Sequence, residues 1–425
     1  MLVVSAIKEN FDKYVVGLEK RGMKNGADLL EEVVQIDEDR KTTQQKLDGI
    51  LAESNQIAKS IGKLMKENKK EEAEEAKQTS SQLKSSGKEL NETLQSLAET
   101  LKEKLYNIPN IPHPSVPAGN TEEDNEVVKQ KGEIPVLPKN AKPHWDLIKE
   151  YDIIDFDLGN KVTGAGFPFY KREGARLIRA MVNYFLDQAN EIGYNEVQPP
   201  VLINEDSGLG TGQLPDKEGQ MYHIEDTNLY LIPTAEVPIT NIYRDVIVNA
   251  SDLPIKTVGY TPCFRREAGS WGSHVRGLNR LHQFDKVEIV QISKPENSYK
   301  ILDEMVAHVE KLVAALGLPY RILRLCGGDL GFTSAITYDF EVFSAAQKKW
   351  LEVSSVSNFE DFQANRLKLR FKDENGKKQL AHTLNGSALA LPRILAALLE
   401  NNQTESEILI PEVLQPFTRF SSIRK

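Results

Sequence analysis

The feature that most limits what this chain can fold into is its long proline-free N-terminal stretch. No proline occurs between Met1 and Ile108. From Ala27 onward, apolar side chains recur every seven residues, a period that keeps them on one side of an α-helix and is typical of coiled coils. The first part of the pattern has Leu29, Ile36, Thr43, Ile50, Ile57 and Leu64 in one heptad position and Val33, Leu47 and Ile61 in the other, where Arg40 and Ser54 interrupt the row.

The seven-residue period breaks at a polar stretch, Glu67–Glu71, and then returns. Its second part has Ala76, Leu83, Leu90 and Leu97 in one row and Ala73, Leu94 and Leu101 in the other. Two apolar stripes separated by a polar turn predict an antiparallel helical hairpin over about 27–105. A dimerising coiled coil would show the same heptads. The break at the mid-point and the small residues of the second leg, among them Ser80 and Gly87, favour the hairpin.

A cluster of prolines ends the helical region. The segment Ile108–Pro117 contains four prolines, which cannot continue a helix and favour an extended, stiff connector. We therefore expect an N-terminal domain over residues 1–107, a linker and lead-in over 108–143, and a second domain over 144–425.

Length and composition agree with a two-domain globular protein. A chain of 425 residues exceeds one ordinary core, and its 40% hydrophobic and 27% charged residues are typical of soluble proteins. The formal net charge of −9 argues against nucleic-acid binding over the whole surface but not against a local basic patch.

Cys263 and Cys326 are too few for a disulfide framework or a cysteine zinc site, so we expect a reduced, cytoplasmic setting and no zinc. No apolar run approaches the ~20 residues of a membrane span, so we expect no membrane partner.

The second domain is organised around one central stretch. An apolar lead-in, a loop rich in Gly, Ser and Arg, and an apolar exit predict a long β-hairpin with a mobile basic tip. Arg265 and Glu267 lie two residues apart, so on a strand their side chains would share one face. Phe284, Lys286 and Glu288 would do the same on the returning strand. Arginine donors beside carboxylates and an aromatic ring suit a phosphate, a purine and an amino group together. A salt-bridged surface hairpin is the alternative interpretation of an isolated Arg-x-Glu pattern.

The order of residues in this stretch carries a family resemblance. Phe-Arg-x-Glu, a loop, and then Arg-x-His-Gln-Phe-x-Lys-Val-Glu resemble motif 2 of the class II aminoacyl-tRNA synthetases, in the form found in seryl-tRNA synthetases. The helix predicted over Ala175–Gly193, with the following strand and Pro200, resembles motif 1. The run Thr383–Arg393 resembles motif 3.

Two shorter elements extend the resemblance over the whole chain. Thr234-Ala235-Glu236 resembles the serine-binding loop of the seryl enzymes, and Glu352-Val353-Ser354-Ser355 resembles their element for ATP and magnesium. The chain departs from the family at Ile336, where many relatives carry Lys. It also departs at Phe343-Ser344-Ala345, which replaces a more usual Trp-Leu-Pro. Neither departure falls on a residue expected in the chemistry, although it puts local strand contacts in doubt.

The resemblance implies a fold and an activity. The implied fold is α+β, an antiparallel β-sheet core flanked by helices, with a long antiparallel coiled-coil arm at the N-terminus. The implied activity is the ATP-dependent charging of serine tRNA with L-serine through a seryl-adenylate, and also of selenocysteine tRNA where that tRNA is present. ATP as a substrate, Mg²⁺, and a homodimer formed through the region around Pro200 are implied with it.

The resemblance also implies the site, residue by residue. Arg265 is expected to bind the α-phosphate and the serine carboxylate, and Glu267 the adenine amino group. The expected catalytic residues are Arg265, Glu267 and Arg393. The expected L-serine residues are Thr234, Ala235, Glu236, Arg265, Glu288, Asn385 and Ser387. The expected ATP residues are Arg265, Arg266, Glu267, Leu281, Phe284, Glu352, Val353, Ser354, Ser355 and Arg393, with Glu352 and Ser355 also expected to hold Mg²⁺.

The predicted arm carries a local positive charge. Between Lys59 and Lys88 there are eight Lys and five Glu, a net charge of +3 in an acidic protein. Lysines on a rigid rod could follow a phosphate backbone, and a solvated helical face is the plainer interpretation of the charge alone. The resemblance implies that the arm holds the long variable arm of serine tRNA. The lysines expected to contact it are Lys59, Lys63, Lys69, Lys70, Lys77, Lys84 and Lys88.

Two other functions are compatible with parts of the sequence. An amino-acid adenylating enzyme that charges another carrier would share the core, but such relatives lack the long arm. A non-catalytic coiled-coil scaffold would explain the arm, but it has no use for Arg265, Glu288 and Arg393 together.

Overall fold

The computed structural model describes residues 1–267 and 276–425. Its contacts divide the chain into two compact units. The first unit consists of Met1–Glu19 and Met23–Pro109, and the second of Lys20–Gly22 and Asn110–Lys425. Among the helices of the described residues, none is long and apolar enough to cross a membrane.

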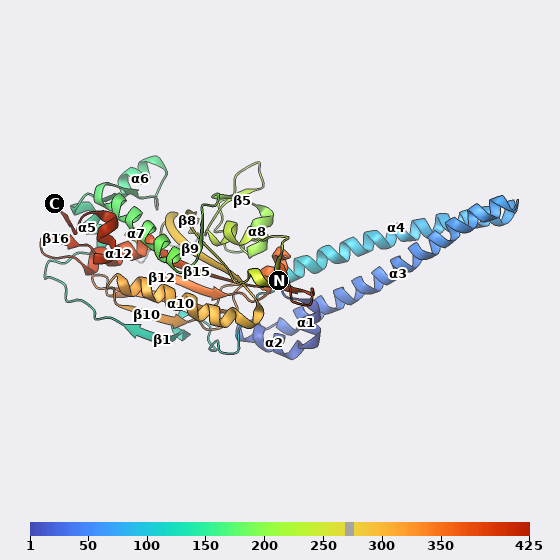
Figure 1. Cartoon of the computed structure of the whole chain (residues 1–425), viewed down its shortest axis with the longest axis horizontal. Helices are drawn as coiled ribbons and strands as arrows, with labels where there is room; N and C mark the ends of the chain where they lie inside the picture. Colours follow the sequence, from blue (N-terminus) through green and yellow to red (C-terminus); the bar gives the residue numbers. More distant parts are fainter. Residues whose placement is uncertain (268–275) are drawn as a thin grey trace. The chain divides into compact units, whose positions relative to one another are not determined.

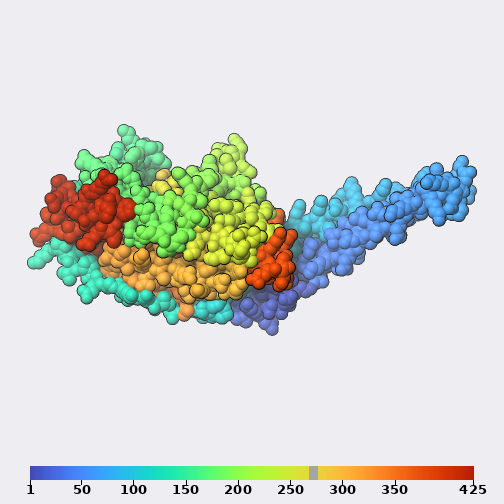
Figure 2. Space-filling view, in the orientation of Figure 1, coloured from blue at the N-terminus to red at the C-terminus, as the bar shows by residue number. Residues whose placement is uncertain are grey.

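The first unit is entirely helical. Two short helices, α1 (Val4–Glu9) and α2 (Phe11–Lys20), precede the long helices α3 (Gly26–Lys66) and α4 (Lys70–Tyr106). Figure 1 shows α3 and α4 side by side, joined by a tight turn, and in the space-filling view of Figure 2 they form a slender rod. The predicted antiparallel hairpin is therefore confirmed.

The seam between the two long helices follows the heptad rows. Val33 and Leu47 are buried on α3, and the small residues Ala73, Ser80 and Gly87 are buried on α4. A Cβ atom on Gly87 would lie 3.7 Å from Ile50 Cγ2, so the helix backbones approach closely there. Small residues on one leg opposite branched residues on the other therefore let the helices pair within one chain.

An eight-stranded sheet forms the centre of the second unit. Its strands are β1 (Glu126–Lys131), β4 (Asn195–Val197), β8 (Ile255–Phe264), β9 (Gln283–Ser293), β10 (Tyr320–Arg324), β11 (Ile336–Ser344), β12 (Lys349–Asn358) and β15 (His382–Ala390). They lie in the order β1-β10-β11-β12-β15-β9-β8-β4, and every neighbouring pair is antiparallel except β4 with β8. The predicted α+β architecture with an antiparallel sheet is confirmed.

Helices bury the sheet in two apolar cores. The larger core is formed with α7 (Arg172–Glu191), α10 (Ser298–Ala315) and α12 (Leu391–Asn401), and the smaller with α9 (Glu236–Asn241) and α11 (Phe362–Leu367). On β9, Val287 and Ile289 belong to the larger core, whereas Val290 and Ile292 belong to the smaller. Because side chains alternate along a strand, Lys286 and Glu288 lie on the side of α9 and α11.

Shorter elements complete the second unit. The helices are α5 (His144–Glu150), α6 (Phe156–Val162), α8 (Glu205–Thr211) and α13 (Gln415–Thr418). The small sheets pair β2 (Ile154–Asp155) with β3 (Phe169–Tyr170), β5 (Leu202–Asn204) with β6 (Leu229–Leu231), and β16 (Glu407–Leu409) with β17 (Ser422–Arg424). A fourth small sheet has three strands in the order β14 (Lys378–Leu380), β13 (Arg370–Lys372) and β7 (Ile247–Asn249).

The segment expected as linker and lead-in is more ordered than its composition indicates. Glu126–Lys131 form an edge strand, because β1 pairs with β10. Asn110 is buried, and its side-chain amide donates hydrogen bonds to the carbonyl oxygens of Thr333 (2.9 Å) and Phe359 (2.8 Å). From Asn110 onward, the proline-rich segment therefore packs as part of the second unit and is not a free connector.

The seam of the arm makes a stability prediction. Leu47 is 7% exposed and Leu51, one turn further along α3, is 50% exposed. Leu47→Ala should destabilise the hairpin by about 2–5 kcal/mol, the usual range for a truncated buried leucine, while Leu51→Ala should change it little. Hydrogen exchange of peptides from α3 and α4 measures the local stability. Equal effects of the two substitutions would contradict the assignment of Leu47 to the buried seam between α3 and α4.

Candidate active site

The hairpin predicted at the centre of the second unit is formed by β8 and β9. Cys263 pairs with Phe284, and Gly259 pairs with Glu288. β8 ends at Phe264, however, so Arg265 and Glu267 do not lie on the strand as expected, and Glu267 has a left-handed φ of 48°. The predicted mobile tip falls largely on residues 268–275, which lie outside the described residues.

A cluster of buried polar side chains, which we call the polar pocket, lies where β9, β15 and the β6–α9 connection meet. Glu288 is 1% exposed. Ser387, its register partner on β15, donates a hydrogen bond from Oγ to Glu288 Oε2 at 3.4 Å. Lys286 Nζ lies 2.6 Å from the same oxygen and donates to Thr234 Oγ1 at 2.7 Å. The backbone N–H of Glu236 also donates to Thr234 Oγ1, at 3.2 Å.

The Glu236 carboxyl forms the other end of this pocket. It is buried and accepts a hydrogen bond of 2.7 Å from the Gln363 amide on α11. Burial, together with the negative charge of Glu288, raises the pKa of Glu236 to about 7, although hydrogen bonds from Gln363 and Asn385 and the charge of Lys286 act in the opposite direction. Buried carboxylates beside hydroxyl groups have the chemistry to bind a small cationic ligand that also carries a hydroxyl group.

The rim of the pocket is cationic and aromatic. The Arg265 guanidinium lies 5.3 Å from the centroid of the Phe284 ring, and its Nε donates to the carbonyl oxygen of Pro233 at 3.4 Å. Arg265 itself is exposed. Glu267 accepts a hydrogen bond of 2.9 Å from Arg280 Nη1. An exposed guanidinium beside a ring and a carboxylate can bind a phosphate and a purine.

Arg393 lies at the start of α12 and connects strand β12 with the turn that precedes β9. Its Nε donates to the carbonyl oxygen of Asn279 at 3.0 Å, and its Nη1 donates to the carbonyl oxygen of Glu352 at 2.8 Å. Nη1 also lies 3.4 Å from the Glu352 carboxylate. The guanidinium is thus held between β12 and the turn that precedes β9.

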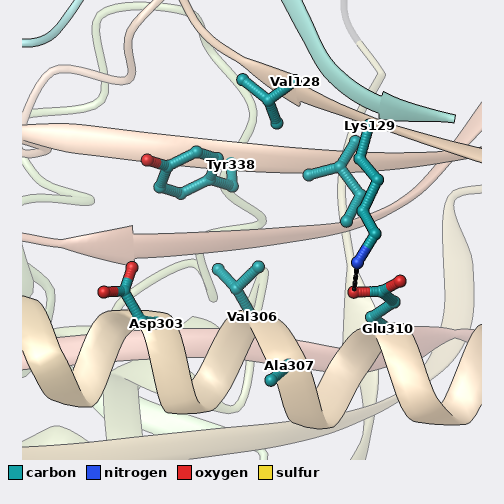
Figure 3. Close-up of a pocket in the computed structure, with 8 residues that line it drawn as sticks. Val128, Lys129, Asp303, Val306, Ala307, Glu310 and Tyr338 are labelled. Carbon is teal, nitrogen blue, oxygen red and sulfur yellow. Dashed lines mark hydrogen bonds and ion pairs between the residues drawn. The ribbon is translucent and has the colours of Figure 1, made fainter.

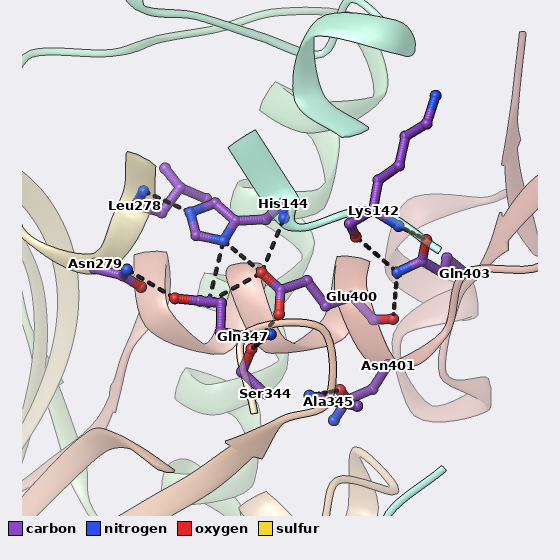
Figure 4. A network of polar contacts seen from close by, with 10 residues as sticks. All are labelled: Lys142, His144, Leu278, Asn279, Ser344, Ala345, Gln347, Glu400, Asn401 and Gln403. Atoms are coloured by element: carbon purple, nitrogen blue, oxygen red, sulfur yellow. Dashed lines mark hydrogen bonds and ion pairs between the residues drawn. The ribbon is translucent and has the colours of Figure 1, made fainter. Parts of the chain in front are cut away.

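A buried network, which sequence patterns did not indicate, holds that turn (Figure 4). His144 Nε2 accepts the backbone N–H of Leu278 at 2.9 Å, and His144 Nδ1 lies 2.7 Å from Glu400 Oε1. The Nδ1 atom must therefore carry the proton and donate to Glu400. Gln347 bridges Asn279 Nδ2 and Glu400 Oε1, with both distances 2.9 Å. The members are up to 256 residues apart, so no local pattern relates them.

The departure Phe343-Ser344-Ala345 belongs to the same network. Ser344 Oγ donates to the Glu400 carboxylate, and the backbone N–H of Ala345 donates to Asn401 at 2.9 Å. Burial would raise the pKa of Glu400, but the hydrogen bonds from His144 and Ser344 outweigh it and lower the pKa below its usual value. The serine found in this chain thus stabilises a buried carboxylate.

A candidate magnesium site lies on β11 and β12. Asp339 and Ser355 are register partners whose side chains hydrogen-bond. Burial and the charge of Glu352 raise the pKa of Asp339 well above its usual range, and Asp339 Oδ1 is buried without a hydrogen-bond partner in the described residues. These oxygen donors suit Mg²⁺ if phosphate oxygens and water complete the coordination. Within residues 1–267 and 276–425, no group of three or more His, Cys, Asp or Glu could hold a metal by itself.

The remaining predicted residues differ in exposure. Leu281, Val353 and Ser354 are buried, and Ser354 Oγ donates to the carbonyl oxygen of Ser387 at 2.6 Å, so these residues pack beneath the site. The Arg266 side chain is exposed, and its backbone N–H donates to the carbonyl oxygen of Gln220 at 2.9 Å.

A separate hollow lies between α10 and the strands at the β1 edge of the sheet. Val128, Val306 and Tyr338 are among the residues that line it, and an ion pair of 2.6 Å joins Lys129 and Glu310 across it (Figure 3). It contains none of the predicted site residues.

The raised pKa of Glu236 makes a prediction about stability and pH. A carboxyl whose folded pKa exceeds its unfolded value binds its proton more tightly in the folded state, so the free energy of unfolding falls as pH rises from about 4.5 to about 7. The fall should approach roughly 3 kcal/mol. Urea titrations across this range should show a fall in Glu236→Gln that is smaller than the fall in the ligand-free parent by about this amount. Identical pH profiles would contradict the assignment.

The geometry can now be compared with known proteins. Residues 1–112 match the seryl-tRNA synthetase N-terminal domain, and residues 222–402 match the tRNA synthetase class II core domain (G, H, P, S and T). The chain is 49% identical to the serine–tRNA ligase of Salinibacter ruber, over 100% of this chain and 99% of that one. It is also similar to the crystal structure of seryl-tRNA synthetase from Pyrococcus horikoshii complexed with ATP, with a TM-score of 0.93 and 35% identity over 100% of this chain and 99% of the other. On the strength of full-length identity and both domain matches, the chain belongs to the seryl-tRNA synthetase family.

Proposed function

We propose that the polar pocket and its cationic rim charge serine tRNA with L-serine in two steps. The serine carboxylate attacks the α-phosphorus of ATP, which forms seryl-adenylate and releases pyrophosphate. The 3′-terminal adenosine hydroxyl of the tRNA then takes the seryl group and releases AMP. The observation that carries this assignment is the buried set Thr234, Glu236, Lys286 and Glu288 directly below the arginine rim.

The pocket binds the amino acid. Glu236 and Thr234 bind the serine ammonium, and Glu288 and Ser387 bind its hydroxyl. We assign Asn385 of β15 and Ala235, which directly precedes α9, to the same serine-binding set. Alanine has no hydroxyl and would leave the buried carboxylate of Glu288 without that partner. The discrimination between serine and alanine is therefore large.

The rim binds the nucleotide. Arg265 binds the α-phosphate and the serine carboxylate, and Glu267 accepts from the adenine amino group. Phe284 and Arg393 pack on either face of the adenine ring. Because no covalent enzyme intermediate is formed, catalysis consists of positioning and charge neutralisation. Two solved relatives, from Pyrococcus horikoshii with ATP and from Naegleria fowleri with AMP, support a nucleotide site in this chain.

Glu352 and Ser355 are the residues that would hold Mg²⁺. The ion, when bound, neutralises charge on the ATP phosphates. The Asp339 oxygen beside Ser355, which has no hydrogen-bond partner among the described residues, supports a cation there. Glu352 is half exposed and pairs with Arg393 at 3.4 Å, so its carboxylate is accessible to such an ion.

The arm binds the variable arm of serine tRNA. Its seven expected lysines are all exposed. Those that pair with a glutamate do so through solvent-exposed contacts of 3.0–4.0 Å, as Lys77 does with Glu74 and Lys88 with Glu92. Exposed pairs of this kind contribute little, so a phosphate can replace the carboxylate. Each phosphate contact releases counterions and makes binding depend on salt.

Two chains form the working enzyme, through the region around Pro200. Pro200 is exposed and follows β4, which is an edge strand of the large sheet. An exposed edge strand needs a partner or a cover.

A reduced, cytoplasmic setting fits both cysteines, Cys263 and Cys326, which are buried and unpaired.

Glu288→Ala tests the amino-acid site. Serine-dependent exchange of pyrophosphate into ATP should fall by at least about 100-fold, because the variant loses the hydroxyl partner and leaves the Lys286 ammonium buried without its carboxylate. Glu310→Ala is the matched control, since Glu310 is also in an ion pair on the second unit but lies in the hollow next to β1. Near-parent exchange by a folded Glu288→Ala protein would refute the assignment.

Replacement of residues 40–90 by a short turn separates the roles of the two units. Pyrophosphate exchange should stay within about two-fold of the parent, since the pocket lies wholly in the second unit, while aminoacylation should be lost together with the phosphate contacts.

A mixed dimer of one armless subunit and one Glu288→Ala subunit then tests where the arm acts. This dimer should charge tRNA if the arm serves the active site of the other subunit. An inactive mixed dimer, beside an active parent dimer, would exclude action across the dimer.

A further inference from the structure

Lys286 is buried in the serine pocket although nothing above assigns it a part in the reaction. It is 6% exposed, on β9, opposite the buried Thr261 of β8. A lysine is rarely buried unless it is paired. The Lys286 ammonium group is therefore expected to be held by specific partners in the interior of the second unit.

Both partners of that ammonium are proposed serine-binding groups. Nζ lies 2.6 Å from Glu288 Oε2 and donates to Thr234 Oγ1 at 2.7 Å. One side chain thus joins the hydroxyl end of the pocket to its ammonium end. The hydrogen bond from Ser387 also reaches Oε2, so neither bond involves the Oε1 atom of Glu288.

The charges of the buried residues also indicate that Lys286 contributes to substrate binding. The described part of the pocket buries two carboxylates, Glu236 and Glu288, and one ammonium, Lys286. Above the pKa of Glu236, which is about 7, both carboxylates can be ionised, and one negative charge is then unbalanced, which one substrate ammonium would neutralise. Without Lys286 the excess would be two charges, which a single monocation cannot balance in a buried site.

We propose that Lys286 is a positioning and specificity-determining residue for serine: its buried ammonium orients Glu288 and Thr234 and leaves the pocket one negative charge to be matched by the amino group of the substrate. The inference rests on the proposed serine site. It assigns Glu288 Oε1 to the substrate hydroxyl, since Lys286 occupies Oε2. Lys286 does not contact the reacting atoms, so it acts through Glu288 and Thr234.

The first test is Lys286→Met, which keeps the length of the side chain and removes its charge. In the pyrophosphate exchange assay, the KM for serine should rise at least about 30-fold while the KM for ATP stays within about two-fold of the parent. The matched control is Lys256→Met on the neighbouring strand β8, where the lysine contacts the Ile192 carbonyl oxygen and the Tyr194 ring. An unchanged KM for serine, or an equal rise for serine and ATP, would overturn the proposal.

The second test asks whether Lys286 acts through Glu288. In a Glu288→Gln background the ion pair with Lys286 is already lost, so adding Lys286→Met should raise the remaining serine KM less than about three-fold, against at least 30-fold in the parent background. Independent effects would multiply, and that result would overturn the proposal. If Lys286→Met alone does not fold, Lys286→Gln, which keeps a donor without the charge, replaces it in the same comparison.

The outcome also separates this inference from the proposed function. Failure of the parent to exchange pyrophosphate in a serine-dependent manner would refute the function itself. Suppose instead that the parent exchanges pyrophosphate normally, that Glu288→Ala loses this activity, and that Lys286→Met keeps the parent KM for serine. These results would refute only the role of Lys286.

Discussion

The burial of two carboxylates beside the central sheet is the constraint on which the rest of the site depends. An ionised carboxylate in an apolar interior is costly by several kcal/mol unless it is paired and hydrogen-bonded. Glu236 has Gln363 as a hydrogen-bond donor, and Glu288 has Lys286 and Ser387. These partners come from α11, β9 and β15, so the pocket exists only when distant parts of the chain are in register. The antiparallel pairing of β9 with β15, which places Ser387 opposite Glu288, supplies that register.

How much of this could be predicted differs between the two units. The arm follows from local information, because the heptad period, the polar break and the small residues Ala73 and Gly87 all act between helices that are adjacent in sequence. The hairpin of β8 and β9 follows from the same kind of pattern, but its details do not. Arg265 and Glu267 lie beyond the strand, and a left-handed φ at Glu267 has no signal in a sequence that lacks glycine there.

The site residues were predicted from an ordered set of motifs that resembles a family, and not from periodicity. Patterns of that kind name residues that touch substrates, and they are silent on residues that act through others. Lys286 was seen only as a member of a strand face. The network of His144, Gln347 and Glu400 was not foreseen, because its hydrogen bonds join segments 53 to 256 residues apart. Edge strand β1 was also missed, since its polar, exposed sequence resembles a linker. Each omission concerns a contact that only the tertiary fold creates.

The lysines of the arm and the lysine of the polar pocket differ in burial, and burial determines what each ammonium group can bind. On the arm, pairs such as Lys77 with Glu74 are exposed on both sides, so water and salt screen them and a phosphate can displace the carboxylate at little cost. In the pocket, Lys286 and Glu288 are both buried, and neither can exchange its partner without leaving a charge unpaired. Exposed lysines therefore suit a long polyanion that must bind and leave in each cycle. The buried lysine suits a fixed cavity that must distinguish serine from molecules one hydroxyl group smaller.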